Sequence, residues 1–202
     1  MKRARVLPAA AVMLALGGCA QMHEMMHGGS DWQNLLANGV AGFSNVGDAN
    51  WRMADGALVA DKGIGFLVTR ETFGDFEMRT EFYAETDTNS GFFVRCSERE
   101  KLTAAVCYEV NIWDARPAPE YGTAAIVDVA KVTNPMPKAG GKWNTMNVTM
   151  KGDHLVVMFN GQKTVDVRHD KLKGGVIGLQ HAKGVKDDLQ PIKFRKVEIR
   201  KL

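Results

Sequence analysis

Polar and apolar residues alternate along many short stretches of this chain. In Phe76–Phe82 the even positions are mostly apolar and the odd positions are charged, which predicts a strand with one solvent-facing side. Asn160-Gly161 separates two such stretches and predicts a two-residue hairpin turn. The expected strands are Trp51–Met53, Ala57–Ala60, Phe66–Val68, Phe76–Tyr83, Gly91–Cys96, Val106–Trp113, Ala124–Val129, Trp143–Lys151, His154–Phe159, Lys163–Arg168, Gly175–Gln180 and Ile192–Arg200.

This density of short strands, separated by Gly, Asn, Asp and Pro, predicts an all-β fold. Antiparallel strands at such spacing are typical of a β-sandwich or jelly roll. The sequence has no internal repeat and no sign of a second domain. We therefore expect residues 31–202 to form a single domain, which is long enough to bury a substantial core.

The first 18 residues have the composition of a secretory signal peptide. Three cations precede an apolar stretch, Val6–Leu16, that is too short to span a bilayer as a mature helix. Leu16-Gly-Gly-Cys19 resembles the bacterial lipobox, in which a lipidated Cys becomes the first mature residue. The alternative is an ordinary secreted protein with a chance Cys. Ala20 after Cys19 predicts sorting to the outer membrane.

Residues 19–30 contain a polar stretch, Gln21–Ser30, that is rich in Met and His and ends in Gly-Gly-Ser, which predicts a flexible tether. Met and His also ligate copper, so a metal-binding segment is the alternative to a spacer.

The formal net charge of the chain falls to zero once this leader is removed. The whole chain has a formal charge of +3, and the leader holds Lys2, Arg3 and Arg5 and no acid, so the remainder is formally neutral. A neutral domain does not support a nucleic-acid partner. Membrane attachment would come from the lipid rather than from a basic patch.

Two cysteines, Cys96 and Cys107, remain if Cys19 carries lipid. An even pair in an oxidising compartment predicts a disulfide, with two reduced thiols as the alternative. The enclosed loop is short, so the bond would stabilise the fold by about 2–3 kcal/mol on the chain-entropy account.

Candidate chemistry is densest in the stretch Cys107–Asp114. On a strand, Glu109, Asn111 and Trp113 share one face, because successive side chains alternate. A carboxylate and an amide suit sugar hydroxyls, and an indole suits the C–H face of a sugar. The alternative is a solvent-facing strand with incidental polar residues.

Arg95 on the preceding strand could bind a carboxylate or a ketone oxygen, or form a structural ion pair. A register that pairs Arg95 with Glu109 is shifted by one residue from the register that pairs Cys96 with Cys107. Both can hold only with a bulge near the cysteines. His181 could be a base or a metal ligand, or a hydrogen-bonded structural residue, and Trp143 could belong to the core.

A set of motifs in order resembles the 3-keto-disaccharide hydrolase family, also called DUF1080. Each motif is weak alone, but together they cover nearly all of the mature chain. They are Trp51-Arg-Met-Ala-Asp-Gly56, Phe73-Gly-Asp-Phe-Glu77, Asn89-Ser-Gly-Phe-Phe-Val-Arg95, Tyr108-Glu-Val-Asn-Ile-Trp-Asp114, Gly141-Lys-Trp-Asn144, Phe159-Asn-Gly161, Gly175-Val-Ile-Gly-Leu-Gln180 and Phe194-Arg-Lys-Val-Glu-Ile-Arg-Lys-Leu202. Asn111 stands where the family usually has Gln.

The resemblance implies a concanavalin- or laminin-G-like jelly roll and cleavage of glycosides already oxidised to a ketone at C3. Such a ketone acidifies the C2 proton, so the reaction needs a base, an electrophile for the enolate oxygen and an acid for the leaving oxygen. The expected catalytic residues are Glu109 as base or metal ligand, Arg95 or a divalent ion as electrophile, and His181 or Asp114 as acid. The expected substrate contacts are Asn111, Trp113, Gln180 and Trp143. A non-catalytic carbohydrate-binding lipoprotein and a structural envelope lipoprotein are the alternatives.

Overall fold

The computed structural model describes residues 31–202, together with Met1. The predicted signal peptide, Cys19 and the tether therefore lie outside the described residues. No helix in the described part is long and apolar enough to cross a membrane. The strands are β1 (Gln33–Asn34), β2 (Phe43–Gly47), β3 (Arg52–Ala54), β4 (Ala57–Ala60), β5 (Gly65–Thr69), β6 (Phe76–Ala84), β7 (Asn89–Cys96), β8 (Tyr108–Ile112), β9 (Lys142–Lys151), β10 (His154–Phe159), β11 (Gln162–Arg168), β12 (Val176–Ala182) and β13 (Ile192–Lys201).

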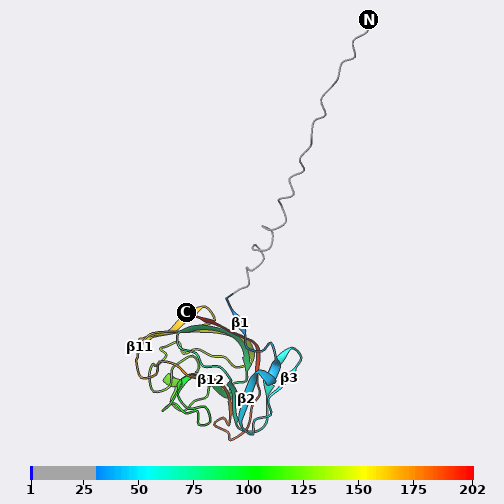
Figure 1. Cartoon of the computed structure of the whole chain (residues 1–202). Coiled ribbons are helices and arrows are strands. Elements are labelled where there is room, and N and C mark those ends of the chain that lie inside the picture. The colour runs from blue at the N-terminus through cyan, green and yellow to red at the C-terminus, as the bar shows by residue number, and fades with distance from the viewer. Residues whose placement is uncertain (2–30) are drawn as a thin grey trace. The chain divides into compact units, whose positions relative to one another are not determined.

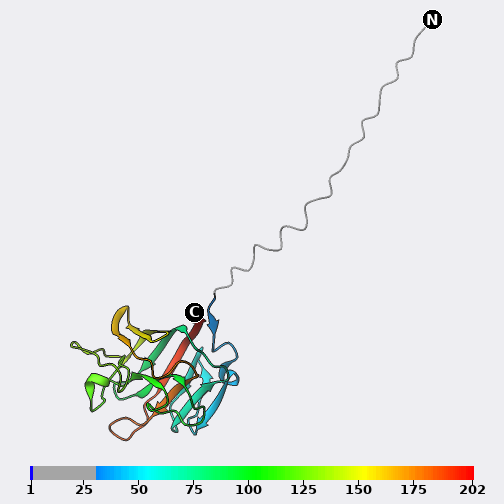
Figure 2. The same ribbon diagram turned by 60° about the vertical axis from the view of Figure 1, so that its left-hand side comes forward.

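The strands form two antiparallel sheets that pack face to face (Figures 1 and 2). Sheet A has eight strands. Seven of them follow the order β11-β10-β9-β6-β13-β4-β3, and the eighth, the short β1, pairs with β13 beside this path. Sheet B has five strands in the order β2-β5-β12-β7-β8. Two 3-10 helices, Gly39–Gly42 and Pro119–Tyr121, lie in connections. The predicted all-β sandwich is confirmed.

Most of the predicted strands are confirmed, two of them, Ala57–Ala60 and His154–Phe159, with the predicted bounds. The prediction of a strand at Ala124–Val129 is wrong. Ala124 and Asp128 have positive φ angles of 68° and 59°, a conformation that breaks a regular strand. The predicted Asn160-Gly161 hairpin turn is confirmed, because both residues have the positive φ that such a turn requires.

The main core lies between the two sheets and is formed by the apolar residues that alternate with polar ones along the strands. Along β6 every second residue is buried, so Phe76, Met78 and Phe82 point inward from sheet A. Phe92 and Val94 on β7 point inward from sheet B and belong to the same apolar cluster. Full burial of a side chain of this size stabilises the fold by about 1.5–3 kcal/mol.

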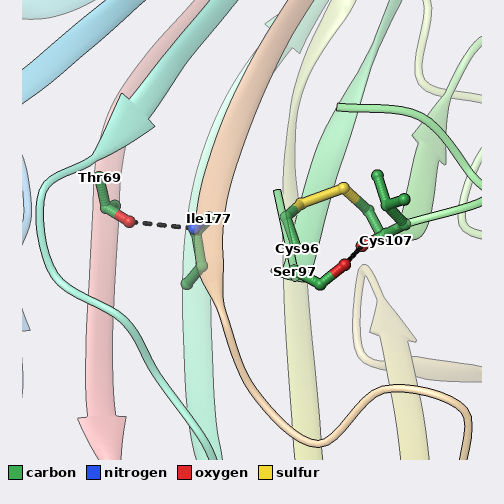
Figure 3. Close-up of a disulfide and its surroundings, with 6 residues drawn as sticks. Thr69, Cys96, Ser97, Cys107 and Ile177 are labelled. Atoms are coloured by element: carbon green, nitrogen blue, oxygen red, sulfur yellow. Dashed lines mark hydrogen bonds between the residues drawn. A yellow bond between two sulfur atoms is a disulfide. The ribbon is translucent and has the colours of Figure 1, made fainter. Parts of the chain in front are cut away.

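A second apolar cluster covers part of the outer face of sheet B. Phe93 and Val176 from the sheet pack there against Leu102, which lies in the loop 97–106. The disulfide between Cys96 and Cys107 closes this loop, as predicted (Figure 3). The loop 97–106 therefore covers one end of the outer face of sheet B.

We predict that replacing both Cys96 and Cys107 by Ser lowers the free energy of unfolding by about 2–3 kcal/mol, because the unfolded chain is no longer cross-linked. Urea unfolding of wild type and double variant would measure it. Wild type unfolded with a reductant is the control and should match the variant. Equal stability of oxidised wild type and variant would contradict the prediction.

Candidate functional site

Beyond the end that loop 97–106 covers, the outer face of sheet B is organised in two rows of residues. Asn111 pairs with Gly91, which pairs in turn with Gln180 on the next strand. In the neighbouring row Glu109 pairs with Phe93. Gly91 carries no side chain, and the three atoms nearest to a Cβ built there are backbone atoms of β8. Asn111 and Gln180 therefore flank a strip of bare backbone.

Glu109 is a buried carboxylate without a partner. It is 8 % exposed, and no group in the described part of the chain donates a hydrogen bond to its carboxylate. Burial raises its pKa from 4.5 to about 7, while the positive charge of Arg116 lowers that pKa and the negative charge of Asp128 raises it further. An acid with a pKa near neutrality can both accept and return a proton, as a general base must.

Two amide oxygens in the neighbouring row also lack partners. Asn111 is fully buried, and its Nδ2 donates to the carbonyl oxygen of Tyr121 at 2.7 Å, which leaves Oδ1 buried and unpaired. Oε1 of Gln180 is buried and unpaired as well. A buried acceptor without a donor costs about 1–3 kcal/mol. Residues 31–202 supply no donor to either oxygen.

Trp113 follows on the same face and is held by Asp87. The indole Nε1 donates to Oδ1 of Asp87 at 2.9 Å, and that carboxylate also accepts from the backbone N–H groups of Val185 and Lys186. Burial raises the pKa of Asp87, but these hydrogen bonds outweigh burial and lower it overall. A cavity of 440 Å³ opens beside this carboxylate, lined in part by Ala115 and Lys186.

Arg95 does not reach this site, which corrects the expectation that it faces Glu109. A bulge is present near the cysteines, and Arg95 occupies it with a φ of 52°, but Glu109 pairs with Phe93 instead. Its guanidinium is fully buried and donates to the carbonyl oxygens of Gly74, Gly152 and Leu172 and to Asp75. Arg95 is therefore a structural residue, and its N–H groups are not free for a ligand.

His181 is also placed away from Glu109. It follows Gln180 on β12, so its side chain points to the opposite face of sheet B, against Trp51. Nδ1 lies 2.8 Å from the carbonyl oxygen of Gly63, and Nε2 lies 3.1 Å from that of Gln190. Both ring nitrogens are thus occupied, and the expected role as acid or metal ligand is corrected to a structural one.

Asp114 anchors the base of the loop 113–141 rather than facing a ligand. Its carboxylate accepts from the backbone N–H groups of Ala139 and Gly140 and from Oγ1 of Thr123. The expectation of Asp114 as the acid is therefore not supported by its geometry.

Trp143, an expected substrate contact and candidate core residue, lies on sheet A. It is 38 % exposed and packs against Tyr83 and Arg195 on the outer face of that sheet. Trp143 is therefore neither a core residue nor part of the group around Glu109.

The sequence reasoning missed Arg116, which the structure places beside Glu109 and over the ring of Trp113. Arg116 lies in a loop without periodicity, so no pattern pointed to it. The divalent ion expected as an alternative electrophile has no ligand set of the usual kind, since residues 31–202 contain no group of three or more His, Cys, Asp or Glu side chains that could hold a metal ion.

The fold and this site define a class, the carbohydrate-active β-sandwiches. A carbohydrate-binding module, CBM66 from Bacillus subtilis, has a TM-score of 0.58 at 15 % identity, over 79 % of this chain and 95 % of that chain. A candidate glycosyl hydrolase from Parabacteroides distasonis has a TM-score of 0.70 at 25 % identity, over 85 % of this chain and 99 % of that one. A search of curated proteins gave no match.

The family is defined by the sequence itself. The profile of the 3-keto-alpha-glucoside-1,2-lyase-like domain matches residues 31–200, almost the entire described domain. The chain belongs to this family, and the resemblance inferred from its motifs is confirmed.

We predict that Glu109→Gln makes the protein more stable at pH 8 by about 3 kcal/mol, because one pKa unit corresponds to about 1.4 kcal/mol. The folded state holds the proton more tightly than the unfolded chain, so wild-type stability falls as pH rises from about 4.5 to 7. Below pH 4.5 the two proteins should be equally stable. Urea unfolding at both pH values measures this, and a difference that does not depend on pH would contradict it.

Proposed function

We propose that this protein cleaves glycosides that carry a ketone at C3, with Glu109 as the base. The proposal is carried by one observation, the unpaired and desolvated carboxylate with a pKa of about 7 beside two unpaired amide oxygens. The family and the glycosyl-hydrolase-like neighbour support a reaction on a glycosidic bond.

The chemistry follows from the acidity of the C2 proton. Glu109 takes that proton, the C–H electron pair forms a double bond between C2 and C3, and the carbonyl electrons move to the C3 oxygen. The enolate then re-forms the ketone and expels the oxygen at C1, breaking the glycosidic bond. The leaving oxygen takes up a proton, which Glu109 can return, and water adds across the C1–C2 double bond.

Asn111 and Gln180 accept hydrogen bonds from sugar hydroxyls in this arrangement, and Trp113 contributes an apolar side.

A second candidate function is carbohydrate binding without catalysis. It is favoured by the placement of Arg95, His181 and Asp114, none of which joins Glu109, whereas the amide oxygens and Trp113 form a binding surface that needs no base. The likeness to CBM66 in fold is consistent with this alternative.

We also propose that the domain is attached to the cell envelope by lipid on Cys19, most simply at the outer membrane. The signal-like leader and the lipobox support this proposal. The substrate would then be a keto-sugar that reaches the envelope.

Glu109→Gln should reduce turnover of 4-nitrophenyl 3-keto-α-glucoside by about 10²–10⁴-fold, because the base is lost while the side-chain size is kept. Wild-type kcat/KM should rise with pH up to about 7, as Glu109 ionises. Release of nitrophenolate measures the rate, and calorimetry measures binding, which the variant should retain.

The matched control is Glu120→Gln, which changes a partly exposed glutamate that pairs with Lys131. It should leave turnover unchanged. Near-normal turnover by Glu109→Gln would remove Glu109 from the mechanism. Wild type that binds plain glycans but never turns over a keto-sugar would establish the binding function instead.

For the lipid anchor, we predict that Cys19→Ser abolishes partition into the membrane fraction. The physical reason is that acyl chains supply the membrane affinity of a domain without a basic patch. Fractionation and intact-mass measurement test this, with the wild type as reference. Unchanged mass and unchanged membrane partition in the variant would contradict the lipid anchor.

A further inference from the structure

Arg116 is a guanidinium with no protein partner at the edge of the candidate site. Its Nε is buried and makes no hydrogen bond in the described part of the chain. The centre of the guanidinium lies 5.7 Å from the centroid of the Trp113 ring. Its charge acts on Glu109 without an ion pair or hydrogen bond between the two. The two groups are therefore close enough for their charges to interact, yet neither satisfies the other.

This isolation is unusual for the chain. Nine arginines lie in residues 31–202, and Arg70, which also lacks a hydrogen-bonded partner, is exposed. The other seven donate to a carboxylate or a backbone carbonyl: Arg52, Arg79, Arg95, Arg99, Arg168, Arg195 and Arg200. Nε of Arg200 is also buried and unpaired, but that guanidinium bonds to Glu77 through Nη2, so Arg116 is the one of these nine that combines a buried donor with no acceptor on any of its nitrogens. A buried donor left unpaired is costly, which points to an acceptor supplied by a ligand.

The chain is fixed in place directly before Arg116. Two residues before it, Asp114 ties the loop to the backbone of Ala139 and Gly140. Three residues before it, Trp113 is held by Asp87 and offers its ring face to the guanidinium. A donor that is fixed before the substrate arrives needs little reorganisation during the reaction, and this is the requirement for stabilising a developing negative charge.

We propose that Arg116 binds the C3 oxygen of the substrate and stabilises it as an enolate oxyanion. As Glu109 removes the C2 proton, the carbonyl electrons move to the C3 oxygen, and N–H groups of Arg116 donate hydrogen bonds to it. A guanidinium suits this role because it stays protonated throughout and presents several donors in one plane. The inference rests on the proposed function and assigns to Arg116 the role that sequence reasoning gave to Arg95.

The test compares Arg116→Ala and Arg116→Lys with Arg195→Ala, on turnover of 4-nitrophenyl 3-keto-α-glucoside. Arg195 also stacks on a tryptophan, Trp143, but lies on the outer face of sheet A, so it controls for loss of a stacked cation. Arg116→Ala should lower kcat by about 10²–10³-fold with little change in KM, because the lost hydrogen bonds form mainly in the transition state. Arg116→Lys should restore part of the rate, and Arg195→Ala should match wild type.

A second readout separates this role from a structural one. Losing the positive charge beside Glu109 removes an influence that lowers its pKa, so the acid limb of kcat/KM should move to higher pH in Arg116→Ala. Asp128, the other charge that acts on Glu109, is unchanged in this variant. The limb should not move in Arg195→Ala.

Two outcomes would overturn the inference and leave the proposed function standing. The first is an Arg116→Ala variant with the kcat of wild type while Glu109→Gln is inactive. The second is an Arg116→Ala variant with a raised KM and an unchanged kcat, which would show that Arg116 binds the ground state only. Absence of keto-glycoside turnover in wild type would instead overturn the proposed function and this inference together.

Discussion

The buried guanidinium of Arg95 holds the two sheets in the relation that the site requires. It donates to the carbonyl oxygens of Gly74, Gly152 and Leu172 and pairs with Asp75 at 2.8 Å. Gly152 lies in the turn between β9 and β10, so a residue of sheet B is bonded directly to sheet A. A buried charge without its partners is strongly destabilising, so the fold depends on this set of acceptors being complete.

Arg95 takes this position because it occupies a bulge, and the bulge also shapes the outer face of sheet B. The extra residue lets Phe93 pair with Glu109 while Cys96 still reaches Cys107. The neighbouring strand must come very close at this point, and a Cβ on Gly175 would lie 1.9 Å from the carbonyl oxygen of Cys96. One local irregularity thus places the guanidinium of Arg95 among its buried acceptors and also lets the disulfide close the loop 97–106.

Alternation was enough to predict the strands and the shared face of Glu109, Asn111 and Trp113, because a regular strand has a strict period of two. It failed where the backbone is irregular. Arg95 was placed wrongly because a positive φ at a non-glycine residue leaves no mark in the sequence. The sequence left open which face of the sheet His181 occupies, because its strand is apolar on both faces. Only the strand register shows the face to which its side chain points.

Missing Arg116 has a different cause, since its position depends on hydrogen bonds between residues far apart in the chain. Asp114 must find the backbone of residues 139–140 before the loop takes its path. The outcome is a carboxylate and a guanidinium that lie near each other without pairing. Had they formed an ion pair, the pKa of Glu109 would be pulled down, and the carboxylate would be a weaker base. Burial without pairing keeps that pKa near 7, and Nε of the guanidinium makes no hydrogen bond within residues 31–202.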